Sequence, residues 1–316
     1  MDEFSLIHQI RHWVKRTPPL TVELGDDAAV FSVASEHQVV CSTDMLIEQI
    51  HFDLHYTSLY DLGWKAAAVN LSDLAAMGAS PRYLLIALGL SRPQQNLRIK
   101  KLYTGLQHLC NRYQTKIIGG DTVASKKLII NITILGEIKK KEIKKRSGAK
   151  PGDWIVVTGT LGDSGAGLEI LQQGEMGHDY LKQRHLRPLP RIIEGRHFAC
   201  QPGVHAMMDI SDGLSSDLNH ICQESGVGAM INLPDIPLSS PLLNYCHHKK
   251  RVPFQFALNS GEDYELLLTC APSQFSKKNV RCKIIGKILP KKAGIWQIQP
   301  NGKKVPLLPK GYQHFH

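Results

Sequence analysis

The sequence lacks the features that mark a secreted, disulfide-bonded or membrane-spanning protein. Its seven cysteines include no Cys-x-x-Cys pair and no regular spacing, a pattern typical of reduced thiols in the cytosol. No uncharged apolar run is long enough to span a membrane, and the N-terminus carries Asp2 and Glu3 without the apolar core of a signal peptide. We therefore expect a cytoplasmic protein with no membrane partner.

The familiar nucleotide-binding loops are absent as well. No Gly-x-x-x-x-Gly-Lys-Ser/Thr segment is present, and the loop sequences of protein kinases are missing. The glycine-rich stretch 159–167 lacks both that lysine and the third glycine of the dinucleotide fingerprint, so it favours a packed turn. A bound nucleotide would have to be held through metal ions and a few basic residues, for which Arg146 is well placed.

The composition is that of a globular protein with an excess of basic residues. The chain has 316 residues, of which 42% are hydrophobic and 21% charged, and its net charge is +10. This length suggests about two domains. The lysines are dispersed in pairs without interleaved aromatic residues, and phosphorylated small molecules fit the charge as well as nucleic acid does. A basic RNA-binding module would bind in a salt-sensitive way without turning over nucleotides, but it leaves the aspartates described below unexplained. We expect no nucleic-acid partner.

Residues 61–78 predict a buried helix, and the part of it after Lys65 carries a single charge. The stretch is rich in strong helix formers, and a glycine and then a proline end the pattern. Between Lys65 and Arg82 the one ionisable residue is Asp73, and Asn70, three residues earlier, shares its helical face. A buried carboxylate is unfavourable unless protonation, a basic partner or a metal ion neutralises it, although backbone amides could also satisfy it in a structural role.

Strands and helices are mixed along both halves of the chain, which predicts the α/β (α+β) fold class in two domains. The lysine-rich segment 139–150 marks the boundary, so the predicted domains are 1–138 and 139–316. The expected helices are 4–15, 61–78, 97–113, 165–173, 191–199 and 214–224. The expected strands are 39–43, 83–90, 116–118, 128–138, 154–158, 204–208, 228–233, 264–269 and 282–288.

The most informative feature is a set of aspartates at places where the chain is expected to change direction. They precede an apolar stretch, follow or end predicted strands, or lie on the helix 61–78; they are Asp26, Asp27, Asp44, Asp73, Asp121, Asp209 and Asp212. Any one of them is most simply a turn residue. Together they offer many oxygen ligands with little nitrogen or sulfur, which is typical of hard-cation chemistry. Magnesium, which combines a few carboxylates with water and phosphate oxygens, is the natural candidate.

Eight short motifs occur in order along almost the whole chain. They are residues 23–30, 42–44, 51–52, 70–79, 119–122, 146–153, 209–214 and 261–266. In this combination the sequence resembles the thiamine-monophosphate kinase family, and the resemblance runs from Phe4 to Phe315.

The resemblance implies a fold, an assembly and a reaction. The fold is the two-domain aminoimidazole-ribonucleotide synthetase-like fold, in which the N-terminal domain forms a shared β-barrel in a homodimer. The reaction is the phosphorylation of thiamine monophosphate by ATP to thiamine diphosphate, the last step of its biosynthesis, assisted by Mg²⁺. Direct in-line transfer needs no general base because a phosphate monoester, with a second pKa of about 6, is already mostly ionised at neutral pH. A phosphoenzyme through His51 is the alternative route.

The resemblance also implies site residues, carried over motif by motif. The implied magnesium ligands are Asp27, Ser42, Thr43, Asp44, Asp73, Asp121, Asp209 and Asp212. The implied ATP contacts are Gly120, Asp121, Arg146 and Ser211, and the implied thiamine-monophosphate contacts are His51, Glu262 and Tyr312. Without the family, His51 would be interpreted as a packed surface histidine and Tyr312 as a C-terminal anchor.

Two positions depart from the family's usual pattern. Gln49 stands two residues before His51, where the family usually has glycine, and Ser260 replaces the first glycine of Gly-Gly-Glu-Asp-Tyr. A serine at position 260 would be strained if that position needed a positive φ. The lysine-rich insert 139–145 is also longer than the family leads us to expect.

Other members of the same fold fit the sequence less well. The first cysteine, Cys41, lies in a predicted strand and not at the reactive N-terminal position of a selenophosphate synthetase. The chain ends in His316, whereas the hydrogenase-maturation relative ends in a functional cysteine. The motif 261–264 suits the thiamine enzyme better than an aminoimidazole-ribonucleotide synthetase.

Overall fold

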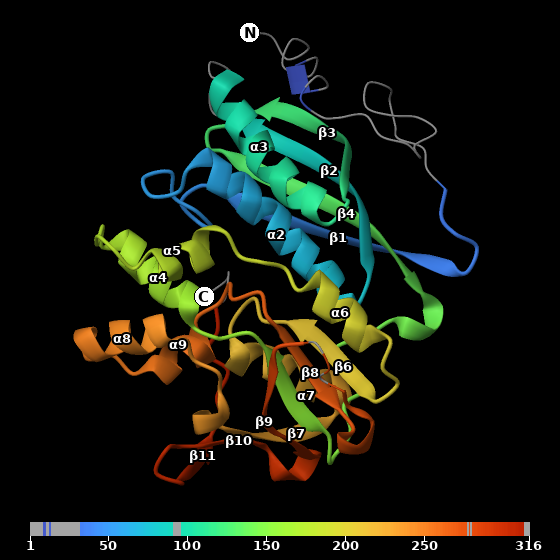
Figure 1. The fold of residues 1–316 in the computed structure, drawn as a ribbon, viewed down its shortest axis with the longest axis vertical. Coiled ribbons are helices and arrows are strands. Elements are labelled where there is room, and N and C mark those ends of the chain that lie inside the picture. Colours follow the sequence, from blue (N-terminus) through green and yellow to red (C-terminus); the bar gives the residue numbers. More distant parts are fainter. Residues whose placement is uncertain are drawn as a thin grey trace. The chain divides into compact units, whose positions relative to one another are not determined.

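The computed structural model describes residues 9–10, 13, 32–90, 96–276, 278 and 280–312, and the chain falls into two compact units (Figure 1). The N-terminal unit comprises the residues up to Leu74 together with Ala79–Lys141. The C-terminal unit comprises Ala75–Gly78 and the chain from Glu142 onward. Within the described ranges, no helix is both long and apolar enough to cross a membrane.

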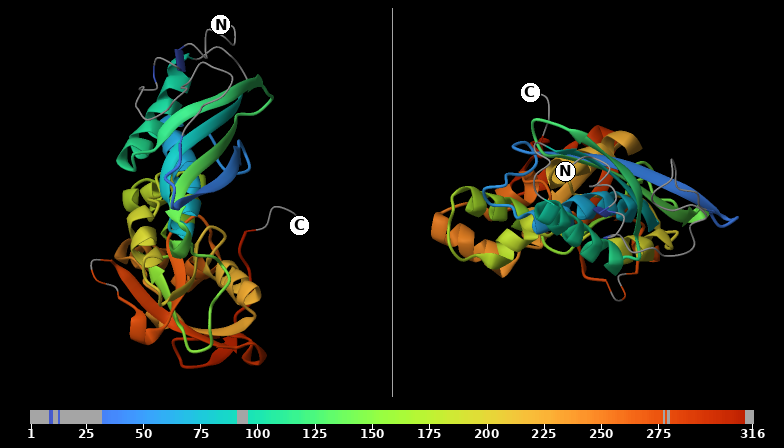
Figure 2. Two further views of the ribbon diagram at one scale, coloured as in Figure 1. Left: turned by 90° about the vertical axis from the view of Figure 1, so that its right-hand side faces the viewer. Right: turned by 90° about the horizontal axis from the view of Figure 1, so that it is seen from above.

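The N-terminal unit is a four-stranded sheet with two helices on one side of it (Figure 2). In spatial order the strands are β1 (His37–Ile47), β4 (Ile129–Lys139), β2 (Ser80–Leu90) and β3 (Lys116–Ala124), with β2 and β3 as the parallel pair. The helices are α2 (Leu59–Met77) and α3 (Asn96–Arg112). Every second residue of β4 is buried toward the helices, while the residues between them are half-buried. The described part of the chain therefore covers one face of this sheet better than the other.

Helices α2 and α3 approach each other closely through two glycines. A Cβ atom on Gly63 would lie 2.0 Å from the carbonyl oxygen of Leu102, and one on Gly105 would lie 1.9 Å from that of Tyr60. Both distances are far inside van der Waals contact, and the obstacle is backbone that no side-chain rotation can move. Each glycine is therefore required by the backbone of the opposite helix.

The N-terminal unit confirms the predicted helix 61–78 and changes the context of several aspartates. Asp73 is half-buried, not fully buried as the apolar sequence around it suggested. Residues 42–44 lie in the middle of β1 and do not end it, because β1 pairs with β4 over its whole length. Residues 119–122 lie inside β3, which continues beyond the predicted 116–118 because it pairs with β2 as far as Ala124. Of the predicted helix 4–15, the described residues 9, 10 and 13 are helical and the rest lie outside the described residues.

The C-terminal unit contains a seven-stranded mixed sheet. Its spatial order is β11 (Lys304–Pro306), β10 (Ile295–Ile298), β7 (Val227–Asn232), β9 (Cys282–Pro290), β5 (Trp154–Thr158), β8 (Leu266–Cys270) and β6 (Val204–Asp209), with β10 and β7 as the parallel pair. Its helices are α4 (Asp163–Gln172), α5 (Asp179–Leu186), α6 (Ile192–Ala199), α7 (Leu214–Ser225), α8 (Ser240–Lys249) and α9 (Pro253–Asn259). The main core joins the sheet to α7 through buried residues that include Ile155, Leu218, Ile221 and Leu267. Short 3₁₀ turns span Lys140–Glu142, Leu233–Asp235, Pro272–Gln274 and Lys291–Ala293.

The sequence pattern did not predict α5, α8, α9, β10 or β11. Each is short, and short helices form in proteins because of packing more than because of their own sequence. For α5 and α8 this packing comes from a separate small core, which they form with α4: Ala166, Ile170, Leu181, Leu242, Tyr245 and Cys246. Strands β10 and β11 form by pairing, β10 with β7 and β11 with β10. These elements therefore depend on contacts with distant parts of the chain, and a local sequence pattern does not indicate such contacts.

Replacing Gly105 by alanine tests the close approach of α2 and α3. Gly→Ala inside a helix ordinarily stabilises by roughly 1 kcal/mol. Here we expect the opposite sign, a loss of about 1–3 kcal/mol in the free energy of unfolding, because the added methyl group meets the Tyr60 carbonyl. Urea unfolding measures the difference. The exposed neighbour Thr104→Ala is the control and should change stability by less than about 0.5 kcal/mol; a stabilised Gly105→Ala variant would contradict the packing argument.

Candidate functional site

The N-terminal unit brings two of the predicted ligands together. The Ser42 hydroxyl, on β1, donates a hydrogen bond to the carboxylate of Asp73, on α2. Side chains alternate along a strand, so Asp44 shares the helix-facing side of the sheet with Ser42 while Thr43 faces the other way. The Thr43 hydroxyl donates to the carbonyl oxygen of Ile132 at 3.0 Å. The side chain of Thr43 therefore does not join the Ser42–Asp73 pair, and Asp27 lies outside the described residues.

His51 is held with one ring nitrogen fixed as an acceptor. The backbone N–H of Ile47 donates to Nδ1 of His51 at 3.0 Å. Because Nδ1 accepts this hydrogen bond, the proton of the neutral imidazole is on Nε2. Gln49, in the same loop, has φ of 64°, and its N–H donates to the carbonyl of Phe52 at 2.7 Å. The loop thus adopts the left-handed conformation that favours glycine, although the residue here is Gln49.

The segment around Asp121 needs a glycine. A Cβ atom on Gly120 would lie 1.9 Å from the carbonyl oxygen of Ile86, so only glycine lets β3 run this close to β2. Asp121 is exposed, and its Oδ1 accepts a hydrogen bond from the N–H of Thr122 at 2.8 Å. The carboxylate is thereby oriented at the surface of the N-terminal unit.

In the C-terminal unit, two of the motifs meet each other and Tyr312. The N–H of Glu262 donates to the carbonyl of Ser211 at 2.8 Å, and the N–H of Tyr312 donates to the carbonyl of Asp212 at 3.2 Å. Gly261 permits this contact, because a Cβ atom there would lie 2.3 Å from the Ser211 carbonyl oxygen. Ser211, Asp212, Glu262 and Tyr312 are therefore adjacent, although they come from distant parts of the sequence. Arg146 is not among them, because it lies beside Ser225 at the other end of α7.

The segment that carries Glu262 is conformationally strained. Glu262 and Tyr264 have φ of 65° and 50°, values that non-glycine residues rarely adopt and that tend to occur at functional sites. The Glu262 carboxylate lies 3.3 Å from Nδ1 of the buried His185. Ser260 has φ of −87°, so the serine at this position is not strained.

A buried ion network holds Glu265, the residue that directly follows this segment. Glu265 is fully buried and accepts hydrogen bonds from Arg191 at 2.6 Å and Arg184 at 2.9 Å, and from the hydroxyl of Thr158 at 2.6 Å. Burial acts to raise the pKa of Glu265, but the arginines and the hydroxyl outweigh it and hold the pKa below its usual value. The sequence did not indicate this network, because its members share no local motif.

Arg146 is exposed in a loop that is tied to the end of α7. The Ser225 hydroxyl accepts hydrogen bonds from the N–H groups of Gly148 and Ala149, both at 3.1 Å, and donates to the Arg146 carbonyl at 3.3 Å. Gly148 has φ of 118°, which favours glycine. The backbone beside Arg146 is thus fixed while its guanidinium stays accessible.

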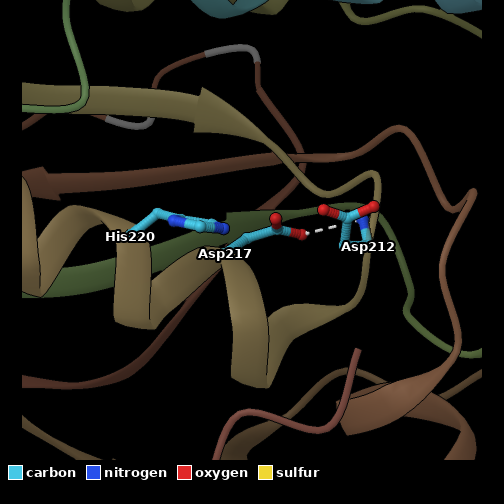
Figure 3. Close-up of side chains that lie close together, drawn as sticks. All are labelled: Asp212, Asp217 and His220. Carbon is cyan, nitrogen blue, oxygen red and sulfur yellow. Dashed lines mark hydrogen bonds between the residues drawn. The ribbon is translucent and has the colours of Figure 1, made fainter. Parts of the chain in front are cut away.

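Asp217 is a further carboxylate at this site that the sequence analysis did not name (Figure 3). Its Oδ2 accepts hydrogen bonds from the N–H groups of Asp212 at 3.2 Å and Gly213 at 3.1 Å. Burial and, secondarily, the negative charges of Asp209 and Asp212 together raise the pKa of Asp217 to about 8, although these N–H groups oppose the shift. The available signal was its place on the predicted helix 214–224, one turn after the Asp-x-Ser-Asp-Gly motif.

The carboxylates at the start of α7 fit a magnesium ion. The donors of Asp209, Asp212 and Asp217 are all oxygens, and hard cations prefer oxygen. Asp217 Oδ1 is buried without a hydrogen-bond partner in the described part of the chain, as expected for an atom that needs a cation. The mutual repulsion that raises the Asp217 pKa is the electrostatic environment in which a divalent ion is stabilising.

Comparison with known families decides the assignment. Residues 25–138 match the family model of the AIR synthase related protein, N-terminal domain, and residues 150–298 match that of the C-terminal domain. The thiamine-monophosphate kinase of Bacillus subtilis is 36% identical over 100% of both chains, and that of Escherichia coli K12 is 40% identical over 99% of this chain and 98% of its own. The chain belongs to the thiamine-monophosphate kinase family.

Solved structures of this family share the fold. The thiamine-monophosphate kinase of Stenotrophomonas maltophilia K279a superimposes with a TM-score of 0.83 at 33% identity, covering 96% of this chain and 98% of its own. AaThiL complexed with AMPPCP and TMP gives a TM-score of 0.81 at 36% identity, covering 99% of this chain and 97% of its own. Hydrogenase maturation protein HypE, at 19% identity and a TM-score of 0.77, shares the fold. The predicted fold class and family are thus confirmed.

Asp217→Asn is expected to raise the free energy of unfolding, by an amount that grows with pH. The folded pKa of about 8 exceeds the usual 3.8, so the folded state binds the proton more tightly and the wild type loses stability as pH rises from about 4 to about 8. Asparagine keeps an acceptor for the same two N–H groups without the charge. We expect a gain on the order of 1 kcal/mol or more near pH 9 and little near pH 5.

Urea unfolding in the presence of a chelator measures this difference at the two pH values. Asp179→Asn, which removes an exposed carboxylate from the first turn of α5, is the control and should show little change. An Asp217→Asn variant whose gain is independent of pH would contradict the assignment of the raised pKa to this residue.

Proposed function

We propose that the chain transfers the γ-phosphoryl group of ATP to thiamine monophosphate, forming thiamine diphosphate and ADP. The observation that carries the proposal is similarity over the whole chain to thiamine-monophosphate kinases, one of which has been solved with AMPPCP and TMP. AMPPCP is an ATP analogue that resists transfer, so that structure holds a pair of ligands corresponding to the two substrates. Both units of the chain take part in the match.

The transfer is direct and in line. The phosphate of thiamine monophosphate, with a second pKa of about 6, is largely dianionic at neutral pH, so its oxygen attacks the γ-phosphorus without a general base. The protein's task is to hold two anions together. The Nε2–H of His51 points to a specific role, because a neutral imidazole with Nδ1 already occupied donates one hydrogen bond to a substrate oxygen.

Each group of predicted residues keeps its proposed role within its own unit. In the N-terminal unit Asp27, Ser42, Asp44, Asp73 and Asp121 would hold magnesium, Gly120 and Asp121 would contact ATP, and His51 would contact thiamine monophosphate. The side chain of Thr43 is not proposed as a ligand beside Ser42 and Asp73, because it faces the other side of the sheet. In the C-terminal unit Asp209 and Asp212 would hold magnesium with Asp217 beside them, Arg146 and Ser211 would contact ATP, and Glu262 and Tyr312 would contact thiamine monophosphate. The chemistry that magnesium supplies when bound is neutralisation of the phosphate oxygens and orientation of the two reactants.

Product analysis tests the activity. The purified chain is incubated with ATP, magnesium and thiamine monophosphate, and we expect thiamine diphosphate and ADP in equal amounts. Asp73→Asn keeps an acceptor for the Ser42 hydroxyl but loses the charge, and it should lower turnover by about 100-fold or more. Asp179→Asn is the matched control and should retain activity. ATP binding without any product from thiamine monophosphate would reject the proposal and direct attention to other phosphate chemistries of the fold.

His51→Ala tests the proposed contact with thiamine monophosphate. We expect the KM for thiamine monophosphate to rise about tenfold or more, with the KM for ATP nearly unchanged, because one hydrogen bond to a charged oxygen is lost. His55→Ala removes an exposed histidine four residues away and should leave both constants unchanged. Equal effects of His51→Ala on the two substrates would contradict this role.

We further propose that the less covered face of the N-terminal sheet binds a second copy of the chain, as the family resemblance implies. Val39 and Met45 of β1 and Val123 of β3 are 47%, 50% and 55% exposed, an unusual density of apolar side chains on strands. They lie among the half-buried residues of β4 and β2. A second copy with the same apolar face would bury both sheets at once.

Light scattering on the purified protein tests the assembly. We expect a mass of twice the chain's 35.2 kDa, and we expect Met45→Lys to shift it toward the single chain. Met176→Lys is the control, because Met176 is 89% exposed in the C-terminal unit. A wild type that is monomeric at micromolar concentration, or a dimer that Met45→Lys leaves intact, would reject this interface.

A further inference from the structure

A mixed nitrogen and oxygen donor set lies at the start of α7. Asp212, Asp217 and His220 each place a potential ligand atom within 4.8 Å of the others. Figure 3 shows Asp217 between the other two side chains. This set differs from the all-oxygen group of Asp209, Asp212 and Asp217 because it includes an imidazole.

Asp217 and His220 are spaced to share one ion. They lie three residues apart on α7 and so occupy one face of the helix. A carboxylate and an imidazole at this spacing are a ligand pair used in helical metal sites, where both project to the same point. Because both side chains come from a single regular helix, little rearrangement is needed to bring their donors to one ion.

One oxygen of Asp217 is fixed by two hydrogen bonds, and the other has no hydrogen-bond partner among the described residues. Oδ2 is held by the N–H groups of Asp212 and Gly213, which orients the carboxylate. Oδ1 makes no hydrogen bond to any described residue, although the residue is only 1% exposed. Buried polar atoms in native proteins nearly always have a partner, and each exception needs an explanation such as a bound ion. The unpartnered oxygen is an observation separate from the clustering of the three side chains.

We propose that Asp212, Asp217 and His220 bind a divalent transition-metal ion such as Mn²⁺, Co²⁺ or Zn²⁺. Imidazole nitrogen is a favourable ligand for such ions, whereas Mg²⁺ prefers oxygen alone. The site shares Asp212 with the proposed magnesium ligands, so the identity of the ion decides whether His220 is used. The inference does not rest on the proposed function, because it concerns binding of the ion by the nucleotide-free protein.

Pulsed electron paramagnetic resonance with Mn²⁺ tests the site. The full-length protein is freed of metal with a chelator and loaded with Mn²⁺ alone. We expect coupling of the electron spin to a histidine nitrogen, which changes from the ¹⁴N to the ¹⁵N pattern when the protein carries ¹⁵N-labelled histidine. His220→Gln should abolish this coupling, and His248→Gln, which alters an exposed histidine on α8, should leave it unchanged.

Titration with Co²⁺ supplies an independent measurement. We expect His220→Gln and Asp217→Asn each to weaken Co²⁺ binding by about tenfold or more, since loss of even an indirect partner of a metal has effects of that size. Absence of histidine coupling in the wild type would overturn the proposal, whether or not the variants fold. Coupling that survives in His220→Gln, or that His248→Gln removes equally, would also overturn it. Failure of the kinase assay with magnesium would count against the proposed function and not against this site.

Discussion

The buried carboxylate of Glu265 is the constraint around which the C-terminal unit is arranged. Its ionised form is stable in the interior only because two arginines and a hydroxyl surround it. Those partners come from α5, from the residue before α6 and from the end of β5, so a single charge fixes three elements against the start of β8. The backbone of Glu265 also accepts a hydrogen bond from the N–H of Ile210, directly after β6. The loop that carries Asp209, Ser211 and Asp212 is therefore held in place by the same residue.

The glycine-rich stretch 159–167 contributes to this arrangement through close packing. A Cβ atom on Gly159 would lie 2.1 Å from Oε1 of Glu265, so the glycine makes room for the buried carboxylate. The N–H groups of Gly162 and Ser164, at the start of α4, donate to the carboxylate of Asp263. The N-terminus of a helix attracts an anion, and here the protein's own side chain occupies it. The packing role expected for these glycines is thereby confirmed.

The parts of the fold that could be predicted are those whose signal is local. The helix around Asp73 was recognisable because a long apolar stretch ends in a glycine and a proline, and the strands of both sheets follow apolar runs. The helices α5 and α8 were missed because a shared small core stabilises them, and their own sequences are short and polar. Strand ends were misplaced near Asp44 and Asp121 because pairing partners, which no local pattern identifies, decide how far a strand continues.

The same holds for the candidate site: local motifs identify residues, whereas the contacts between those residues depend on the tertiary fold. The motifs identified candidate residues, but they did not indicate that Ser42 and Thr43 point to opposite faces of a sheet or that Glu262 meets Ser211. Asp217 was missed because its significance depends on its burial beside two other carboxylates. Gln49 shows the converse, since its left-handed φ keeps the backbone conformation that the family's glycine would favour.

Two buried acidic groups in the C-terminal unit have opposite electrostatic environments. One belongs to a structural ion network, and the other belongs to the candidate cation site. Glu265 has its counter-charges within the protein, and its pKa is held below the usual value. Asp217 instead faces Asp209 and Asp212, and its pKa is raised to about 8, which opposes ionisation by several kcal/mol. A cation bound there would stabilise the ionised form, and linkage requires that it also displace the proton. Binding of a cation at the start of α7 would therefore be coupled to release of a proton, whereas the charge of Glu265 is already balanced by the two arginines.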